Sequence, residues 1–164
     1  MKLEYREHQW GFTMSWRVSA RTLLVLLVVL AIAAWGTAAS ATTSSVRSAP
    51  NGDVLVTVSA GTLTDRDRDG DFNTGMKGDT ASLFFAVVNQ TSVTQTVRID
   101  YVLDGPGTDL DRTFTQDVVL EPNGIHQERE EFKVQQKTPR GGYTLTVTGS
   151  GTETATAIAT FMLN

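Results

Sequence analysis

Turn signals divide the chain after residue 52 into short runs of residues that favour β-strands. In most of these runs Val, Ile, Leu, Thr or aromatic residues alternate with polar residues, which gives a strand one apolar face. No long amphipathic helical pattern occurs in this part of the sequence. The seven runs cover residues 53–60, 81–89, 93–103, 112–120, 125–134, 143–148 and 152–163.

The runs differ in how much of each strand should be buried. Residues 81–89 are nearly all apolar, which predicts a central strand. Alternation in the next run places Val97, Ile99, Tyr101 and Leu103 on one face. The same pattern in residues 143–148 turns Tyr143, Leu145 and Val147 inward. We therefore expect residues 53–164 to form an all-β domain, an immunoglobulin-like antiparallel sandwich of about seven strands.

One segment, TPRGGYTLTVTGSG at residues 138–151, resembles the penultimate strand of bacterial immunoglobulin-like and fibronectin-like extracellular domains. In those domains a Pro-containing turn precedes a Gly-x-Tyr-x-Leu-x-Val pattern. Here Gly142 directly precedes Tyr143, so the spacing departs by one residue. The resemblance implies the fold and transfers no active site. Tyr143 is then either a corner tyrosine, with its hydroxyl bonded to backbone, or an ordinary core tyrosine.

The first 41 residues have a different character from the rest. Residues 23–35 form an unbroken apolar run, which Arg17 and Arg21 precede and small residues follow. This succession predicts a signal peptide or hydrophobic helix over residues 1–41, cleaved after Ala41, with Met14 as an alternative start. An uncleaved membrane anchor is the other reading, but the run is shorter than the about 20 residues that a spanning helix needs. Residues 42–52 are rich in Ser, Thr and Ala and predict a flexible spacer.

Composition excludes several classes of function. The chain has no cysteine, so it has no disulfide, thiol nucleophile or thiolate metal site. Its net charge of −4 offers no basic face for nucleic acid. We expect a secreted or cell-envelope protein whose partner is another protein or a surface polymer. Membrane contact would occur only through an uncleaved N-terminal segment. A subunit of an exported fibre or layer that assembles through strand edges, with TATAIATFML as the joining strand, is the alternative.

The stretch DRDRDGDFNTGMKGD at residues 65–79 resembles calcium loops of the DxDxDG type. On that pattern Asp65, Asp67, Asp69, Asp71 and Asn73 supply oxygen ligands, and Gly70 stands where the loop must turn. Position twelve, normally glutamate, is Met76, so we expect Asp79 to supply the missing carboxylate. The alternative is a solvated loop in which Arg66 and Arg68 neutralise the aspartates.

No catalytic motif stands out, and we expect the protein not to be an enzyme. His126 lies in a polar run and reads as a surface residue. Glu128 and Glu130 share one face of that run, which reads as a solvated strand. Asn89 begins an Asn-Gln-Thr sequon for glycosylation, which matters only in a host that glycosylates it.

Overall fold

The computed structural model describes residues 43–64, 72–107 and 111–164, and this part of the chain consists of β-strands joined by turns. The all-β prediction is confirmed, and no helix occurs among these residues. The described part therefore contains no helix that could cross a membrane. The strands are β1 (Thr43–Ser48), β2 (Val54–Thr62), β3 (Thr74–Gly75), β4 (Thr80–Asn89), β5 (Gln95–Asp104), β6 (Arg112–Leu120), β7 (Ile125–Lys133), β8 (Gly141–Ser150) and β9 (Thr154–Leu163).

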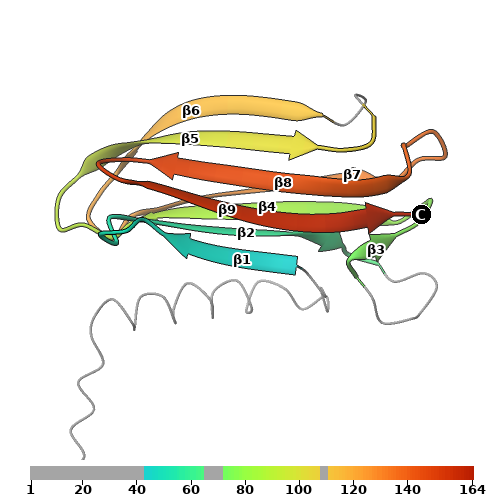
Figure 1. Cartoon of the computed structure of the whole chain (residues 1–164), viewed down its shortest axis with the longest axis horizontal. Coiled ribbons are helices and arrows are strands. Elements are labelled where there is room, and N and C mark those ends of the chain that lie inside the picture. Colours follow the sequence, from blue (N-terminus) through green and yellow to red (C-terminus); the bar gives the residue numbers. More distant parts are fainter. Residues whose placement is uncertain (1–42, 65–71, 108–110) are drawn as a thin grey trace, which may run out of the picture. The chain divides into compact units, whose positions relative to one another are not determined.

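The strands form two sheets (Figure 1). Sheet A has the order β1-β2-β4-β7, and all its pairs are antiparallel. Sheet B has the order β3-β9-β8-β5-β6, and its pairs are antiparallel except for a short parallel pair between β3 and β9. The apolar run predicted as a central strand is β4, which lies between β2 and β7 as expected.

The facing sides of the two sheets share one hydrophobic core. Its members alternate along the strands with residues that point the other way, as the period of two predicts. In β5, Val97, Ile99, Tyr101 and Leu103 are buried, and in β8 the inward residues are Tyr143, Leu145 and Val147. Phe85 of β4 reaches across to sheet B, with its ring centroid 5.9 Å from that of Tyr101. The predicted inward residues of both strands are confirmed.

Tyr143 is a corner residue rather than an ordinary core tyrosine. Its hydroxyl donates a hydrogen bond of 2.8 Å to the carbonyl oxygen of Pro139, four residues earlier in the turn that leads into β8. The ring stacks on Phe161 and also covers Gly105, where a Cβ would collide with the ring atoms. The glycine between β5 and β6 therefore permits the close approach of this ring.

Two strands were missing from the sequence-based prediction. Thr43–Ser48 forms β1 along the edge of β2, so the expectation of a flexible spacer over residues 42–52 is wrong for this part. Only the tight turn after β1 is irregular. The Gly52 N–H closes this turn with a hydrogen bond of 2.8 Å to the carbonyl oxygen of Ala49. The second missing strand is β3, where Thr74 and Gly75 pair with Met162 and Leu163. Both strands are short, and each depends on a neighbouring strand that its own sequence does not reveal.

Candidate functional site

The structure describes only part of the predicted calcium loop. Asp65, Asp67, Asp69 and Asp71 lie outside the described residues, whereas Asn73 and Asp79 lie within them. The Asn73 carbonyl oxygen accepts a hydrogen bond of 2.7 Å from the Met162 N–H, which ties this residue to β9. Within the ranges that the structure describes, no group of three acidic or histidine side chains is placed to hold a metal ion.

Asp79 joins the two flanks of the acidic stretch. Its side chain is almost wholly buried, with 1% of the residue exposed. One carboxylate oxygen accepts a hydrogen bond of 2.9 Å from the Thr64 hydroxyl, and the other accepts one of 2.8 Å from the Met76 N–H. Thr64 directly precedes the acidic run and Met76 follows it. The carboxylate therefore connects the chain on either side of residues 65–71.

A second polar cluster lies between β6 and β7, the free edge strands at one side of the two sheets. These strands follow one another in the chain but belong to different sheets, so side chains rather than backbone hydrogen bonds connect them. We call this cluster the β6–β7 seam. Its members are Arg112 and Gln116 from β6 and His126, Glu128 and Glu130 from β7.

Side-chain hydrogen bonds and an ion pair connect β6 and β7 across the seam. The Gln116 amide nitrogen lies 2.8 Å from a carboxylate oxygen of Glu128 and 3.1 Å from His126 Nε2. His126 Nε2 in turn lies 2.9 Å from the same oxygen of Glu128. Arg112, four residues before Gln116 on β6, forms an ion pair with Glu130, two residues after Glu128 on β7. Each polar inward side chain of β7 thus has a polar partner on β6 or β7.

Aromatic rings form the floor beneath the seam. The rings of Tyr101 and Phe114 stack with centroids 4.7 Å apart, and the Phe85 ring lies 6.0 Å from the His126 ring. Burial, together with the nearby Glu130 carboxylate, raises the pKa of the Tyr101 phenol well above its usual range. Its hydroxyl is buried and has no hydrogen-bond partner within the described part of the chain.

The seam corrects two sequence-based predictions. His126 is not a simple surface residue, because only 23% of its side chain is exposed and its ring packs against Phe85. Glu128 and Glu130 do share one face, as expected, but that face points toward the gap between the sheets and is half-buried. Phe132 on the same face packs against the core that contains Val134, and these two apolar residues were the signal in the sequence that this face turns inward.

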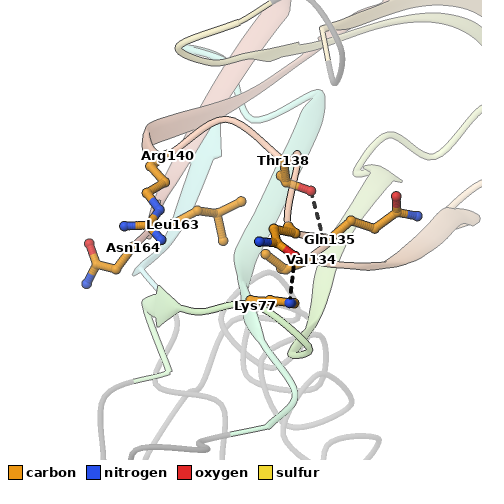
Figure 2. A pocket seen from close by; sticks show the side chains of 8 residues that line it. Lys77, Val134, Gln135, Thr138, Arg140, Leu163 and Asn164 are labelled. Atoms are coloured by element: carbon orange, nitrogen blue, oxygen red, sulfur yellow. Dashed lines mark hydrogen bonds between the residues drawn. The ribbon is translucent and has the colours of Figure 1, made fainter.

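A small hollow opens at the end of the molecule where β7 leads into β8 (Figure 2). Its volume is about 90 Å³, and Val134 and Leu163 provide its apolar part. The Lys77 ammonium donates a hydrogen bond of 2.9 Å to the Gln136 side chain, and the Thr138 hydroxyl accepts one of 2.9 Å from the Gln135 N–H. Arg140 and Asn164 complete the lining. The hollow is far smaller than the about 300–1,000 Å³ of most small-molecule sites.

Asn89, the sequon residue, is a buried connector between strands and loops. It is 0% exposed. Its amide nitrogen lies 2.8 Å from the Val93 oxygen and 3.0 Å from both the Leu120 and Glu121 oxygens. Its side-chain oxygen accepts hydrogen bonds from the N–H and hydroxyl of Thr91 and from the Gln95 amide. A glycan could be attached to this nitrogen only before folding, or after the loss of these bonds.

The comparisons with known proteins provide no family. No protein-family model matches the chain. No curated protein matches it.

Several solved structures share a distant likeness with the chain. The DNA glycosylase AlkC of Pseudomonas fluorescens is 17% identical, with a TM-score of 0.38 over 56% of this chain and 28% of that one. A β-glucosidase of saponin metabolism from intestinal bacteria is 16% identical, with a TM-score of 0.41 over 76% of this chain and 16% of that one. A β-glucosidase from Erythrobacter marinus is 12% identical, with a TM-score of 0.40 over 75% and 16%. This chain spans less than a third of each, and likenesses this distant carry no argument about fold or function.

Proposed function

We propose that the chain is an exported, non-enzymatic domain of immunoglobulin-like fold, with a binding or structural role at or outside the cell surface. The observation that carries the proposal is the order of the strands. In immunoglobulin domains strands A, B and E share one sheet, and strands C, F and G share the other. Here β2, β4 and β7 lie together in one sheet, and β5, β8 and β9 lie together in the other.

Further features favour the same fold. The strand β6 extends the second sheet beyond β5, in the place where variable-type domains add a strand. Tyr143 stands at the start of β8, and its hydroxyl bonds the backbone four residues upstream. A tyrosine with this contact at the start of strand F is a hallmark of immunoglobulin-like sandwiches. The resemblance of residues 138–151 to bacterial surface domains agrees with this assignment.

The bonding of the polar side chains favours binding over catalysis. The histidine of the seam is already hydrogen-bonded to Gln116 and Glu128 and covered on one side by Phe85. A general base must reach a proton of the substrate, whereas Nε2 of His126 points at Gln116 and Glu128. The hollow of Figure 2, at about 90 Å³, is smaller than most small-molecule sites. We therefore infer that the domain binds a protein partner or a surface polymer.

Calcium is the cofactor that the acidic stretch would take. On the spacing of the DxDxDG pattern, the residues that would supply oxygen ligands are Asp65, Asp67, Asp69, Asp71 and Asn73. Asp79 contributes mainly by fixing both flanks of the stretch through Thr64 and Met76.

Assembly through strand edges has less support. The joining strand of that alternative, β9, has β8 along one side, and on the other side its end pairs with β3. The free edge strand β7 carries Arg129, Glu131 and Lys133 on its outer side, and charges of this kind hinder edge-to-edge pairing.

Fractionation of a culture that produces the full chain tests the proposal. We expect protein in the medium or the envelope whose N-terminus, read by intact mass and amino-terminal sequencing, lies near Thr42. Protein that starts upstream of residue 23 and remains in the membrane fraction would contradict export as a cleaved domain. Labelled released protein should also bind to the surface of the producing cells, and it should bind less after competition with unlabelled protein.

A further inference from the structure

The strand β6 (Arg112–Leu120) forms one edge of sheet B along its whole length (Figure 1). It pairs with β5 without a bulge, and no described strand lies on its other side. The edge strands β1 and β3 are shorter, with six and two residues against nine. The edge strand β7 carries a run of charges at residues 128–131, whereas β6 has only Arg112 and Asp117. A long edge strand with few charges and no proline is a template for another strand.

The direction of the backbone groups on this edge follows from hydrogen bonds of β9. The Met162 N–H bonds the Asn73 oxygen and the Ile158 N–H bonds Ser45 Oγ, both on the side of β9 that faces away from β8. In an antiparallel sheet, the backbone groups of successive residues point to opposite sides of the strand. Counted through the registers of β8 and β5, this alternation turns the odd-numbered residues of β6 toward the free edge. These residues are Thr113, Thr115, Asp117 and Val119.

The four outward residues present unpaired backbone groups on an exposed strand. Within the ranges that the structure describes, their N–H groups take part in no hydrogen bond. All four residues are exposed, and Val119 has the largest exposed fraction of the described large apolar residues, 66%. A second strand along this edge would satisfy the backbone groups and cover the valine.

We propose that β6 pairs with β6 of a second copy of this chain, antiparallel and about a two-fold axis at Gln116. Gln116 is the middle residue of the strand, so this register uses the full length of both copies. The outward residues of one copy then lie opposite those of the other and form about eight backbone hydrogen bonds. The two copies of sheet B become one continuous sheet, and the same surface lies on both sides of the axis.

The side chains that meet in this register are complementary. Phe114 comes opposite Val118 of the second copy, and an aromatic side chain opposite a β-branched one stabilises a sheet. Thr115 comes opposite Asp117, while the other charged residue, Arg112, lies at the end of the strand. An axis at Asp117 would set two carboxylates against each other and shorten the pairing. The strand therefore selects the register centred on Gln116.

The pairing produces a closed dimer and not a fibre. Each β6 edge is used once, and at the far side of sheet B the short strand β3 covers the end of β9. Further along β9, Ser45 occupies the Ile158 N–H. The joined sheet therefore offers no second edge as long and open as β6.

A single cysteine tests the register, because the chain has none of its own. The two residues on the axis form a pair without backbone hydrogen bonds, whose Cα atoms lie about 4.5 Å apart, within the range of a disulfide. Gln116→Cys, expressed in the full chain, should therefore form a covalent dimer on oxidation with copper phenanthroline, seen by non-reducing electrophoresis and intact mass. Val119→Cys is the matched control. Its thiol is more exposed, but the two copies would lie about 20 Å apart, so it should cross-link at least about tenfold more slowly.

A proline tests the backbone hydrogen bonds. Asp117→Pro removes an N–H that points toward the second copy and leaves the bonds to β5 in place. In sedimentation velocity the wild type should be a dimer that dissociates on dilution. The variant should weaken that dimer by at least about tenfold, because the symmetric pair loses two bonds. Gln127→Pro removes an outward N–H from the edge of β7 and should leave the dimer unchanged.

Several results would overturn the proposal. One is a Gln116→Cys protein that cross-links no faster than Val119→Cys. Another is a dimer that Asp117→Pro, with the circular dichroism spectrum of the wild type, leaves unchanged. A wild-type protein that is monomeric at all concentrations also overturns it, in favour of a different occupant of the β6 edge. If Asp117→Pro does not fold, the two cysteine variants decide the question alone.

Discussion

Replacement of Asn89 by Asp tests whether this residue holds one end of the domain together. The substitution keeps the shape of the side chain and its acceptor oxygen, but it removes both amide protons. Those protons serve the carbonyl oxygens of Val93 in the loop after β4, Leu120 at the end of β6 and Glu121 in the turn after it. The three oxygens would then face a carboxylate that cannot donate.

The expected loss of stability follows from the number of bonds. A buried polar group that loses its partner costs about 1–3 kcal/mol, so the loss of two donor protons should cost about 2–6 kcal/mol. A domain of this size has a total stability of about 5–15 kcal/mol, so the variant should be close to unfolding at physiological temperature. Urea denaturation followed by far-ultraviolet circular dichroism measures the change, since every tryptophan precedes residue 36.

The matched control is Thr91→Val. It also destroys the glycosylation sequon, but it leaves the Asn89 amide protons in place and removes one hydroxyl. It should cost only about 0.5–1.5 kcal/mol. The argument that the Asn89 amide connects the loops would be refuted if Asn89→Asp lowered the stability by no more than Thr91→Val does.

Three further predictions concern the core, the aromatic floor of the seam and the acidic stretch. Phe85→Ala should destabilise the domain by about 3–5 kcal/mol in the same urea assay, because the ring is buried between the sheets; a change under about 1 kcal/mol would contradict its placement. Because the pKa of Tyr101 is raised in the folded state, the unfolded chain releases this proton first, so stability should fall as pH rises above about 10. Tyr101→Phe should flatten that fall, and an unchanged alkaline profile would count against the raised pKa. Calcium at a hundredfold excess over its dissociation constant should stabilise the domain by about 2.7 kcal/mol, magnesium should do less, and Asp67→Ala should abolish the effect. No heat on isothermal titration with millimolar calcium would leave a charged loop without a metal.

The sequence predicted best which residues face the core in strands whose apolar and polar residues alternate strictly. In β5 and β8 every second residue is apolar, and a pleated strand has only two faces, so the inward residues follow directly. Tyr143 could be located for the same reason. Its bond to Pro139 depended on the geometry of the turn, and the sequence left two alternatives open.

The seam could not be predicted, because its members depend on partners from another strand. A row of His126, Glu128 and Glu130 reads as a solvated face when it is considered alone. Burial of such side chains becomes favourable only when donors and charges are supplied to them, and these come from Gln116 and Arg112. Nothing in either strand reveals that β6 and β7 face each other across the two sheets. The strand β1 (Thr43–Ser48) was missed for a related reason. It has little apolar character, and it is a strand because it pairs with the edge of β2.

The interleaved order of the strands has a consequence for how fast the chain can reach its native state. Sheet A takes the first, second, fourth and seventh strands, and sheet B takes the others, so no continuous half of the chain contains a complete sheet. Most pairings therefore join residues that are far apart in sequence, and the loss of chain entropy comes before the contacts that compensate for it. Folding should take milliseconds to seconds, as in other all-β domains of non-local topology. The two sheets can therefore form only once strands from both halves of the chain have come together.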